Sequence, residues 1–188
     1  MQRALVGVLV AAFTAPACGG RGSPGKSSGP LAPDAAPLVV TSSAFATNGD
    51  IPTEYTCDGE GSSPPLQWGD APAGTQSFAV IVDDPDAPDP AKPERVYLHW
   101  LVYDIPAGVH ALDAGALPEG ARVGKNEEGD DEWTPPCPPT GRHRYFHRVY
   151  ALDTMLGDLD EPDRATLEAA MKPHVLATGH IVGTYAKS

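Results

Sequence analysis

Two apolar runs near the middle of the chain predict neighbouring buried strands. Residues 78–82 (FAVIV) and 96–105 (VYLHWLVYDI) are rich in β-branched and aromatic side chains, which is typical of strands buried on both faces. The segment between them, 83–90 (DDPDAPDP), is predicted to be a loop because its prolines lack a backbone N–H and restrict the residues before them. A rigid, carboxylate-rich loop between two buried strands is a favourable place for a binding site. We expect Asp84 and Asp86 to serve that site, and Asp83 and Asp89 to be solvated.

The rest of the pattern predicts more strands and a single helix. The helix is expected over 163–171, with Asp163 as its N-cap and Pro173 ending it. A long polar, proline-rich loop is expected over 124–140, and loops of that length are usually functional or disordered. Strands or extended segments are expected at 38–42, 51–59, 63–68, 144–152 and 180–185.

Composition narrows the fold class and the range of partners. The 188 residues are enough for one folded domain, and 20 glycines and 21 prolines favour turns and short strands over a helical bundle. The net charge of -12 at pH 7 makes binding to nucleic acid unfavourable. A small anion is still allowed, because hydrogen-bond donors in a pocket act at short range.

The beginning of the chain has the pattern of an export signal. Residues 4–13 are an apolar run after Arg3, too short to span a bilayer but typical of a signal peptide. Residues 15–18 (APAC) resemble a bacterial lipoprotein cleavage site, which would make Cys18 the lipid-modified first residue of the mature protein. The alternative is an ordinary secretory signal cut near Ala17. Both alternatives predict an exported protein that faces the periplasm or the cell exterior.

Three regions follow from this pattern. Residues 1–18 are predicted to be the signal peptide, and residues 38–188 the folded domain. Residues 19–37 are rich in Gly, Pro, Ser and Ala, so they cannot bury enough apolar surface to fold and are predicted to be a flexible tether. The membrane would then be contacted only through the lipid on Cys18.

A second group of polar residues lies in the predicted strand near 144–152. Alternation along a strand places His143, Tyr145 and His147 on one face, with Arg144 and Arg148 on the other. Set against carboxylates and another imidazole, these groups would form a small polar pocket. A protonated histidine and a tyrosine hydroxyl donate hydrogen bonds to an anion, while an aspartate orients the imidazole.

Several motifs in order along the chain resemble the phosphatidylethanolamine-binding protein family, in its bacterial Raf-kinase-inhibitor-like branch. The resemblance covers nearly all of residues 38–185. The motifs are Ile51-Pro52, 55–59 (YTCDG), 63–68 (SPPLQW), 84–88 (DPDAP), His99-Trp100, 136–139 (PCPP), 141–145 (GRHRY) and 183–185 (GTY).

The resemblance implies a mainly β fold, an antiparallel β-sandwich with a few short peripheral helices. It also implies a non-enzymatic binding module with a pocket for a small phosphoryl or carboxylate ligand, and no cofactor. The pocket residues carried over from the family are Asp84, Asp86, His99, His143 and Tyr145. Pro135 stands where the family usually has glycine, so a backbone N–H contact to the ligand would be missing.

Two other functions remain as alternatives. Family members also inhibit kinases or serine proteases by contact, so the pocket rim would be a surface for a protease or kinase partner. An unrecognised hydrolase is the third hypothesis, but the chain has no Gly-x-Ser-x-Gly motif and no evident serine beside a base. No catalytic residue is therefore assigned.

The histidines and cysteines are candidates for metal ligands and for a disulfide. His143 and His147 are too far apart on a strand to share a metal, and there is no Cys-x-x-Cys or His-Glu-x-x-His pattern. No metal site is expected. If lipid occupies Cys18, Cys57 and Cys137 remain as either a disulfide or two buried thiols, and both alternatives stay open because sequence does not give their separation.

Overall fold

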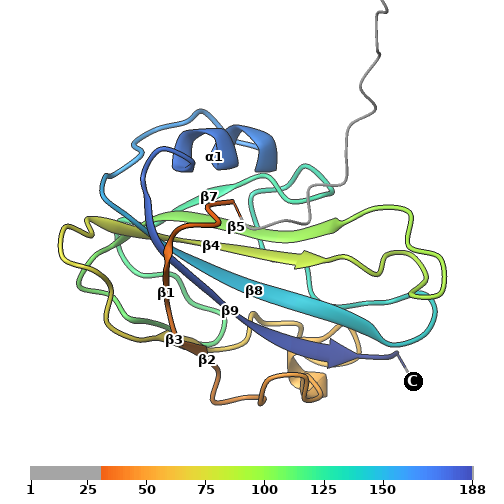
Figure 1. The fold of residues 1–188 in the computed structure, drawn as a ribbon. Coiled ribbons are helices and arrows are strands. Elements are labelled where there is room, and N and C mark those ends of the chain that lie inside the picture. Colours follow the sequence, from red (N-terminus) through yellow and green to blue (C-terminus); the bar gives the residue numbers. More distant parts are fainter. Residues whose placement is uncertain (1–30, 188) are drawn as a thin grey trace, which may run out of the picture.

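The fold is built on two sheets, and the structure, a computed structural model, describes residues 31–187 (Figure 1). The large sheet has the strand order β1-β9-β8-β4-β5-β7 and the small one β2-β3-β6. All strand pairs are antiparallel except β1 with β9. The strands are β1 Ala36–Pro37, β2 Val40–Thr41, β3 Leu66–Trp68, β4 Ser77–Asp84, β5 Tyr97–Pro106, β6 Ala111–Leu112, β7 Arg122–Gly124, β8 His143–Leu152 and β9 Val175–Tyr185.

The mainly β fold predicted from the sequence is confirmed, with one parallel strand pair added. Figure 1 shows the small sheet and the helix α1 (Arg164–Met171) on opposite sides of the large sheet. A short 3-10 turn, Thr53–Tyr55, replaces the extended backbone expected there. The helix is capped by Asp163, whose carboxylate accepts from the Thr166 N–H at 2.8 Å, as predicted.

Strand β4 is buried on both faces, which explains its unbroken apolar sequence. Alternate residues Phe78, Val80 and Val82 belong to the core between the two sheets. The intervening Ala79 and Ile81 belong to a second cluster beneath the helix, with Leu167 and Met171. The central strands β5, β4 and β8 are therefore fixed from both sides, and their ends form a rigid frame.

The start of the folded part lies earlier than the boundary predicted at Leu38. Strand β1 pairs with Ala177 and Thr178 of β9, and Leu31 packs against the cluster beneath the helix. The sequence of β1 is like that of a linker, so only its backbone pairing reveals it. The predicted signal peptide, the Cys18 lipidation site and most of the tether lie outside the described residues.

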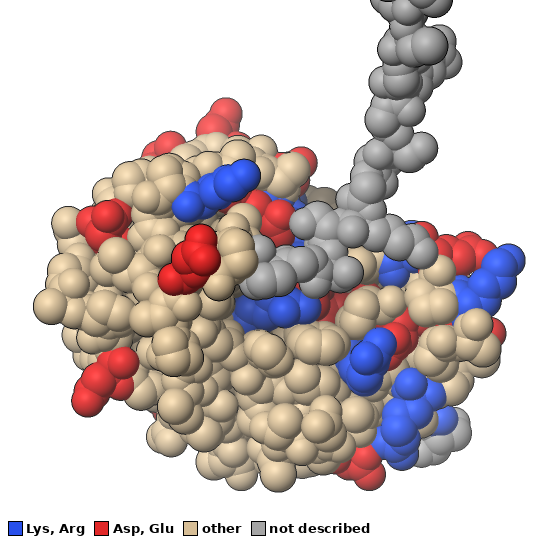
Figure 2. All heavy atoms as spheres, viewed as in Figure 1, with Lys and Arg blue, Asp and Glu red and all other residues tan. Residues whose placement is uncertain are grey.

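The charged residues on the face shown in Figure 2 are interspersed, with Lys and Arg lying among Asp and Glu.

Asp83, which we expected to be solvated, is instead 1% exposed within β4. It is paired there with Arg148 and Arg164. No helix in the part of the chain that the structure describes is long and apolar enough to cross a membrane.

Candidate functional site

A cavity of about 300 Å³ lies where the central strands meet the loops before β5 and before β8. Four of the five predicted pocket residues line it: Asp84, His99, His143 and Tyr145. The sheet register brings them together, because Asp84 ends β4 beside Tyr97 at the start of β5, while His143 begins the antiparallel neighbour β8. The order and register of the strands therefore determine which side chains line the cavity.

His143 is held at both ring nitrogens by the protein itself. Its Nδ1 lies 2.6 Å from Asp84 Oδ2, and its Nε2 lies 2.9 Å from the carbonyl oxygen of Thr140. A carbonyl oxygen only accepts, so the Nε2–H donates to it. We predicted that His143 would donate to an anion, but in this arrangement neither of its nitrogens is left for a ligand. The side chain instead forms a fixed wall of the cavity.

Asp84 connects this wall to the loop that follows β4. Besides His143, its carboxylate accepts from the Asp86 N–H at 2.8 Å. Burial raises the pKa of the Asp84 carboxyl, and the hydrogen bond with His143 opposes that rise. Asp84 is therefore placed to orient the imidazole of His143.

Asp86, the fifth predicted residue, is not among the residues that line the cavity. Its carboxylate accepts two hydrogen bonds from the Arg144 guanidinium, at 2.8 Å and 2.6 Å, and one from the Arg144 backbone N–H at 3.0 Å. Burial alone would raise the pKa of the Asp86 carboxyl, but the bonds from Arg144 outweigh burial and lower the pKa. Asp86 joins the loop to β8 and does not orient an imidazole.

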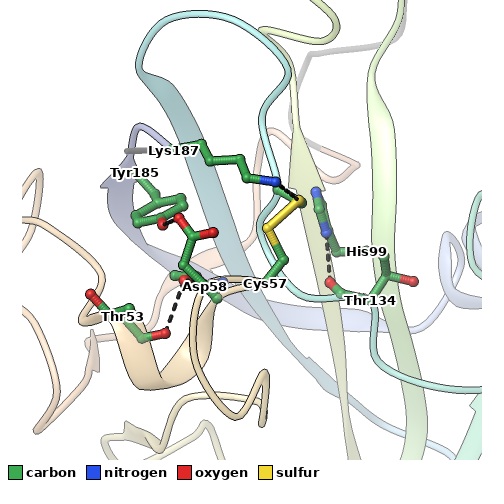
Figure 3. Close-up of a disulfide and its surroundings, with 9 residues drawn as sticks. Thr53, Cys57, Asp58, His99, Thr134, Tyr185 and Lys187 are labelled. Carbon is green, nitrogen blue, oxygen red and sulfur yellow. Dashed lines mark hydrogen bonds between the residues drawn. A yellow bond between two sulfur atoms is a disulfide. The ribbon is translucent and has the colours of Figure 1, made fainter.

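His99 and Tyr145 line the cavity, and each has one buried polar atom without a hydrogen-bond partner in the protein. His99 Nδ1 lies 2.7 Å from the Thr134 carbonyl oxygen (Figure 3), while its Nε2 is buried and unpaired. The Tyr145 hydroxyl is also buried and unpaired. Burial lowers the pKa of His99 to about 4 and raises the pKa of Tyr145. Their rings lie 5.2 Å apart, nearly edge to face. Such atoms call for an explanation, and among the described residues Trp68, Trp133 and His147, which do not line this cavity, also have them.

The rim contains three residues that the sequence reasoning missed. The Tyr97 hydroxyl donates to Glu128 Oε1 at 2.7 Å, and the Arg95 guanidinium lies 5.3 Å from the centre of the Tyr97 ring. Arg95 is the only Lys or Arg among the described residues that line the cavity. The length and polarity of the 124–140 loop were a signal for Glu128, because such loops are often functional.

A disulfide ties the cavity loop to the turn after Thr53–Tyr55. Of the two alternatives for Cys57 and Cys137, the structure has the bridge, with Cα atoms 5.4 Å apart and a sequence separation of 80. Figure 3 shows it beside His99. The Cys57 N–H also donates to the Pro136 carbonyl at 3.1 Å. Pro135 and Cys137 both line the cavity, so this cross-link supports its wall.

A second cavity, of about 330 Å³, has Trp133 in its wall. Its lining is mainly apolar but includes Asp131 and Glu132. Unlike the first, it contains no histidine, lysine or arginine among its described lining residues. Within residues 31–187, no group of three or more His, Cys, Asp or Glu side chains is placed to hold a metal ion.

Comparison with known proteins finds a matching family model and several similar relatives. A family model described as phosphatidylethanolamine-binding protein matches residues 41–186. A relative from Methanothermobacter thermautotrophicus, named UPF0098 protein, is 43% identical over 149 residues, covering 77% of this chain and 95% of the relative. A UPF0098 protein of Chlamydia trachomatis is 39% identical over 150 residues, covering 80% and 99%.

Two solved structures are similar along most of the chain. One is a Chlamydia trachomatis protein described as a putative phosphatidylethanolamine-binding protein homologue, with 38% identity and a TM-score of 0.76, covering 82% of this chain and 100% of the other. The second is YbcL of E. coli, described as a new member of the mammalian PEBP family. It has 33% identity and a TM-score of 0.72, and the match covers 81% of this chain and 100% of YbcL.

Proposed function

Because the chain belongs to the phosphatidylethanolamine-binding protein family, we propose that it binds a small phosphoryl or carboxylate group in the cavity lined by His99 and Tyr145. Members of this family are generally binding proteins. The observation that carries the proposal is the pair of buried polar atoms, His99 Nε2 and the Tyr145 hydroxyl, that have no partner in the protein. Leaving such atoms unpaired is costly, and a polar ligand removes that cost.

The charge around the cavity suits a small anionic group of low charge. Arg95 supplies a cation at the rim, and the Tyr145 hydroxyl supplies a buried donor. Asp84 is already engaged by His143 and the Asp86 N–H, so its charge is partly offset inside the wall. The volume of about 300 Å³ fits a small headgroup.

The same residues favour binding over turnover. Among the described lining residues there is no serine, and Cys137 is held in the disulfide. Both nitrogens of His143 are engaged, so it is not free to act as a general base. Neither a serine nor a free cysteine is therefore available among the described lining residues as a nucleophile for covalent hydrolysis.

Export and a lipid anchor remain part of the proposal. The support comes from the apolar run at 4–13 and the APAC sequence ending at Cys18. A disulfide between Cys57 and Cys137 is also typical of proteins that reside outside the reducing cytosol. Mass spectrometry of the mature protein tests this: a chain that begins with an acylated Cys18 supports the anchor, and a chain that retains Met1 excludes it.

Calorimetric titration of the protein with inorganic phosphate and with acetate tests the binding function. Tyr145→Phe removes only the hydroxyl, and we expect it to weaken binding about tenfold or more. Tyr150→Phe is the matched control, because Tyr150 is buried in the cluster beneath the helix, away from the cavity. Absence of binding by the native protein, or equal binding by both variants, would contradict the proposal and favour a protein partner at the rim.

A further inference from the structure

We propose that the second cavity, which has Trp133 in its wall, binds an organic ammonium ion. The apolar body of the ligand fills the cavity, and its charged end lies at the carboxylates of Asp131 and Glu132. The ligand class is a primary amine that carries an aromatic or aliphatic group. This cavity shares no described lining residue with the cavity at the ends of the central strands. The inference therefore goes beyond the proposed binding function and does not depend on it.

The wall of the second cavity offers apolar and aromatic surface. Trp100 and Trp133 both line it, and their ring centroids lie 5.6 Å apart with an interplanar angle of 77°. Val123 of β7 and Leu117 of the loop after β6 add aliphatic surface. The Leu117 side chain is 42% exposed, so a ligand here would cover apolar surface that faces water. Tryptophan is also the side chain that attracts cations most strongly.

The charge of the cavity favours a cation. Asp131 and Glu132 are exposed, and neither side chain has a hydrogen bond or an ion pair within residues 31–187. Arg122 and Lys125, the basic residues nearest in sequence to Val123, are each ion-paired with acids outside this lining. The two carboxylates therefore remain without a positive partner from the protein. An apolar body with one positive end is the complement of such a site.

A buried asparagine fixes the loop that carries the two carboxylates. Asn126 is 6% exposed, and its Nδ2 donates to the Glu132 carbonyl at 3.2 Å. Its Oδ1 accepts from the Asp130 N–H at 3.0 Å, and its own N–H donates to the Asp130 carbonyl at 2.8 Å. These bonds hold the backbone on both sides of Asp131 without using the acidic side chains of the cavity. The long loop expected over 124–140 thus presents its carboxylates in a fixed position.

Hydrogen bonds also fix another part of the wall. The Gly115 N–H donates to the Ser63 carbonyl at 3.0 Å and to Ser63 Oγ at 3.2 Å, and Ser63 is 4% exposed. This pair of bonds ties the loop after β6, which includes Ala116 and Leu117, to the segment before β3. The cavity of about 330 Å³ is therefore largely preformed, and its size suits a small amine.

The test is titration of the protein with phenethylammonium, with phenethyl alcohol as an uncharged analogue of similar shape. Trp100 and Trp133 are two of the three tryptophans in the chain, so tryptophan emission reports binding and calorimetry measures the affinity. At low ionic strength we expect the amine to bind at least about fivefold more tightly than the alcohol. Added salt should reduce that preference, because it screens charges near the surface.

A second cation distinguishes the two sources of an ammonium group. Nα-acetyl-lysine amide carries the same charge on an aliphatic chain. Tighter binding of phenethylammonium would support a free amine as the ligand. Tighter binding of the lysine derivative would support the same ligand class, supplied by a lysine side chain of a protein.

Three variants locate the binding site. Asp131→Asn combined with Glu132→Gln should weaken phenethylammonium binding at least about fivefold and leave phenethyl alcohol binding unchanged. Asp34→Asn combined with Asp70→Asn is the matched control, because it removes the same charge from exposed positions outside the cavity. Ala116→Trp introduces a large ring at an exposed position of the lining, so it should block both ligands.

A preference for the amine that disappears in the Asp131 and Glu132 double variant supports the inference. Equal binding of amine and alcohol, unchanged affinity in that variant, or full binding by Ala116→Trp would overturn it. Absence of amine binding by the native protein would overturn it as well. The phosphate and acetate titrations are independent of these results, so failure here leaves the proposed anion-binding function intact. The comparison of amine with alcohol uses the native protein, so it remains decisive even if a variant does not fold.

Discussion

Asp83 and Arg164 form an ion pair that attaches the helix to the large sheet. Arg164 Nη2 lies 3.0 Å from Asp83 Oδ2, and the same oxygen lies 3.1 Å from Arg148 Nε. The Asp83 side chain is 2% exposed and the two guanidinium side chains about a fifth exposed. Arg164 also binds Glu168 within the helix, at 2.8 Å. The single buried carboxylate of Asp83 thus offsets the positive charges of two arginines, one on β8 and one on α1.

Replacing Asp83 by asparagine should destabilise the protein by about 3 kcal/mol, because removing one partner of a buried ion pair leaves uncompensated buried charge. The guanidinium groups of Arg148 and Arg164 would both lose this partner, although Arg164 would keep its ion pair with Glu168. Urea unfolding followed by circular dichroism measures the loss. Asp70→Asn is the control, since it makes the same charge change at an exposed position. Equal stability of the two variants would show that the pair contributes nothing.

The Cys57–Cys137 disulfide should make a large contribution to stability. It closes a loop with a sequence separation of 80 residues, and a bridge of that span stabilises by about 2–5 kcal/mol, chiefly by restricting the unfolded chain. We expect a reducing agent to lower the urea midpoint of the native protein. It should leave a double Cys57→Ser, Cys137→Ser variant unchanged. A native midpoint that does not respond to reductant would contradict the bridge.

The fold could be predicted where burial controls the sequence. Strands β4, β5 and β8 are apolar or alternating because they pack against the core, so their patterns are easily identified. Two of the three shortest strands could not be found in this way, whereas β2 lies within the strand expected at 38–42. Ala36–Pro37 and Ala111–Leu112 have two residues each, and backbone pairing with a neighbour defines them, which leaves almost no mark on side-chain pattern.

Four of the five residues expected in the pocket line the cavity, but the sequence did not predict their hydrogen bonds. Asp84, His99, His143 and Tyr145 come together because the strand ends that carry them are adjacent in the sheet. Asp86 does not join them, because Arg144 competes for its carboxylate. The free nitrogen of His99 depends on a loop carbonyl 35 residues away in sequence. No periodicity in the sequence encodes a contact of that kind.

Gly179 should be intolerant of a side chain. It pairs with Val149 in the large sheet, and a Cβ added there would lie 1.8 Å from the Leu38 carbonyl oxygen. The obstacle is backbone, so the segment at Leu38 would have to move away from β9. We expect Gly179→Ala to cost at least about 1–3 kcal/mol, as overpacking typically does.

Thermal unfolding measures this cost, as a fall in Tm of roughly 2–4 °C per kcal/mol for a protein of this size. Gly108→Ala is the control, because no atom lies within 4 Å of a Cβ built there. Similar Tm values for the two variants would mean that the segment at Leu38 moves away from β9 without a loss of stability. That result would argue against tight packing of Leu38 on β9.

Stability should fall as the pH is lowered, and two buried histidines are a specific cause. Burial lowers the pKa of His147 to about 3 and that of His99 to about 4, against an ordinary value near 6.5. Between those values the unfolded chain binds protons that the folded protein does not, so acid favours unfolding. Their contribution to stability is complete above about pH 6.5 and is lost progressively toward pH 4.

The magnitude follows from the proton affinities of the two states, because a tenfold difference in affinity corresponds to about 1.4 kcal/mol. Each histidine should therefore cost roughly 2–3 kcal/mol between pH 7 and about pH 4.5. Carboxylates also titrate in this range, with the pKa values of Asp84 and Asp86 displaced in opposite directions. Because the same carboxylates are present in every variant, comparing variants cancels the contribution of the carboxylates to the pH dependence of stability.

Urea unfolding at the two pH values makes that comparison. On acidification, His147→Leu should lose less stability than the native protein, because its unfolded chain has one fewer imidazole to protonate. The difference should equal the free-energy cost given above for one histidine. His110→Leu, at the exposed surface, should follow the native protein. If His147→Leu keeps the full native slope, the buried ring is not the source of acid sensitivity.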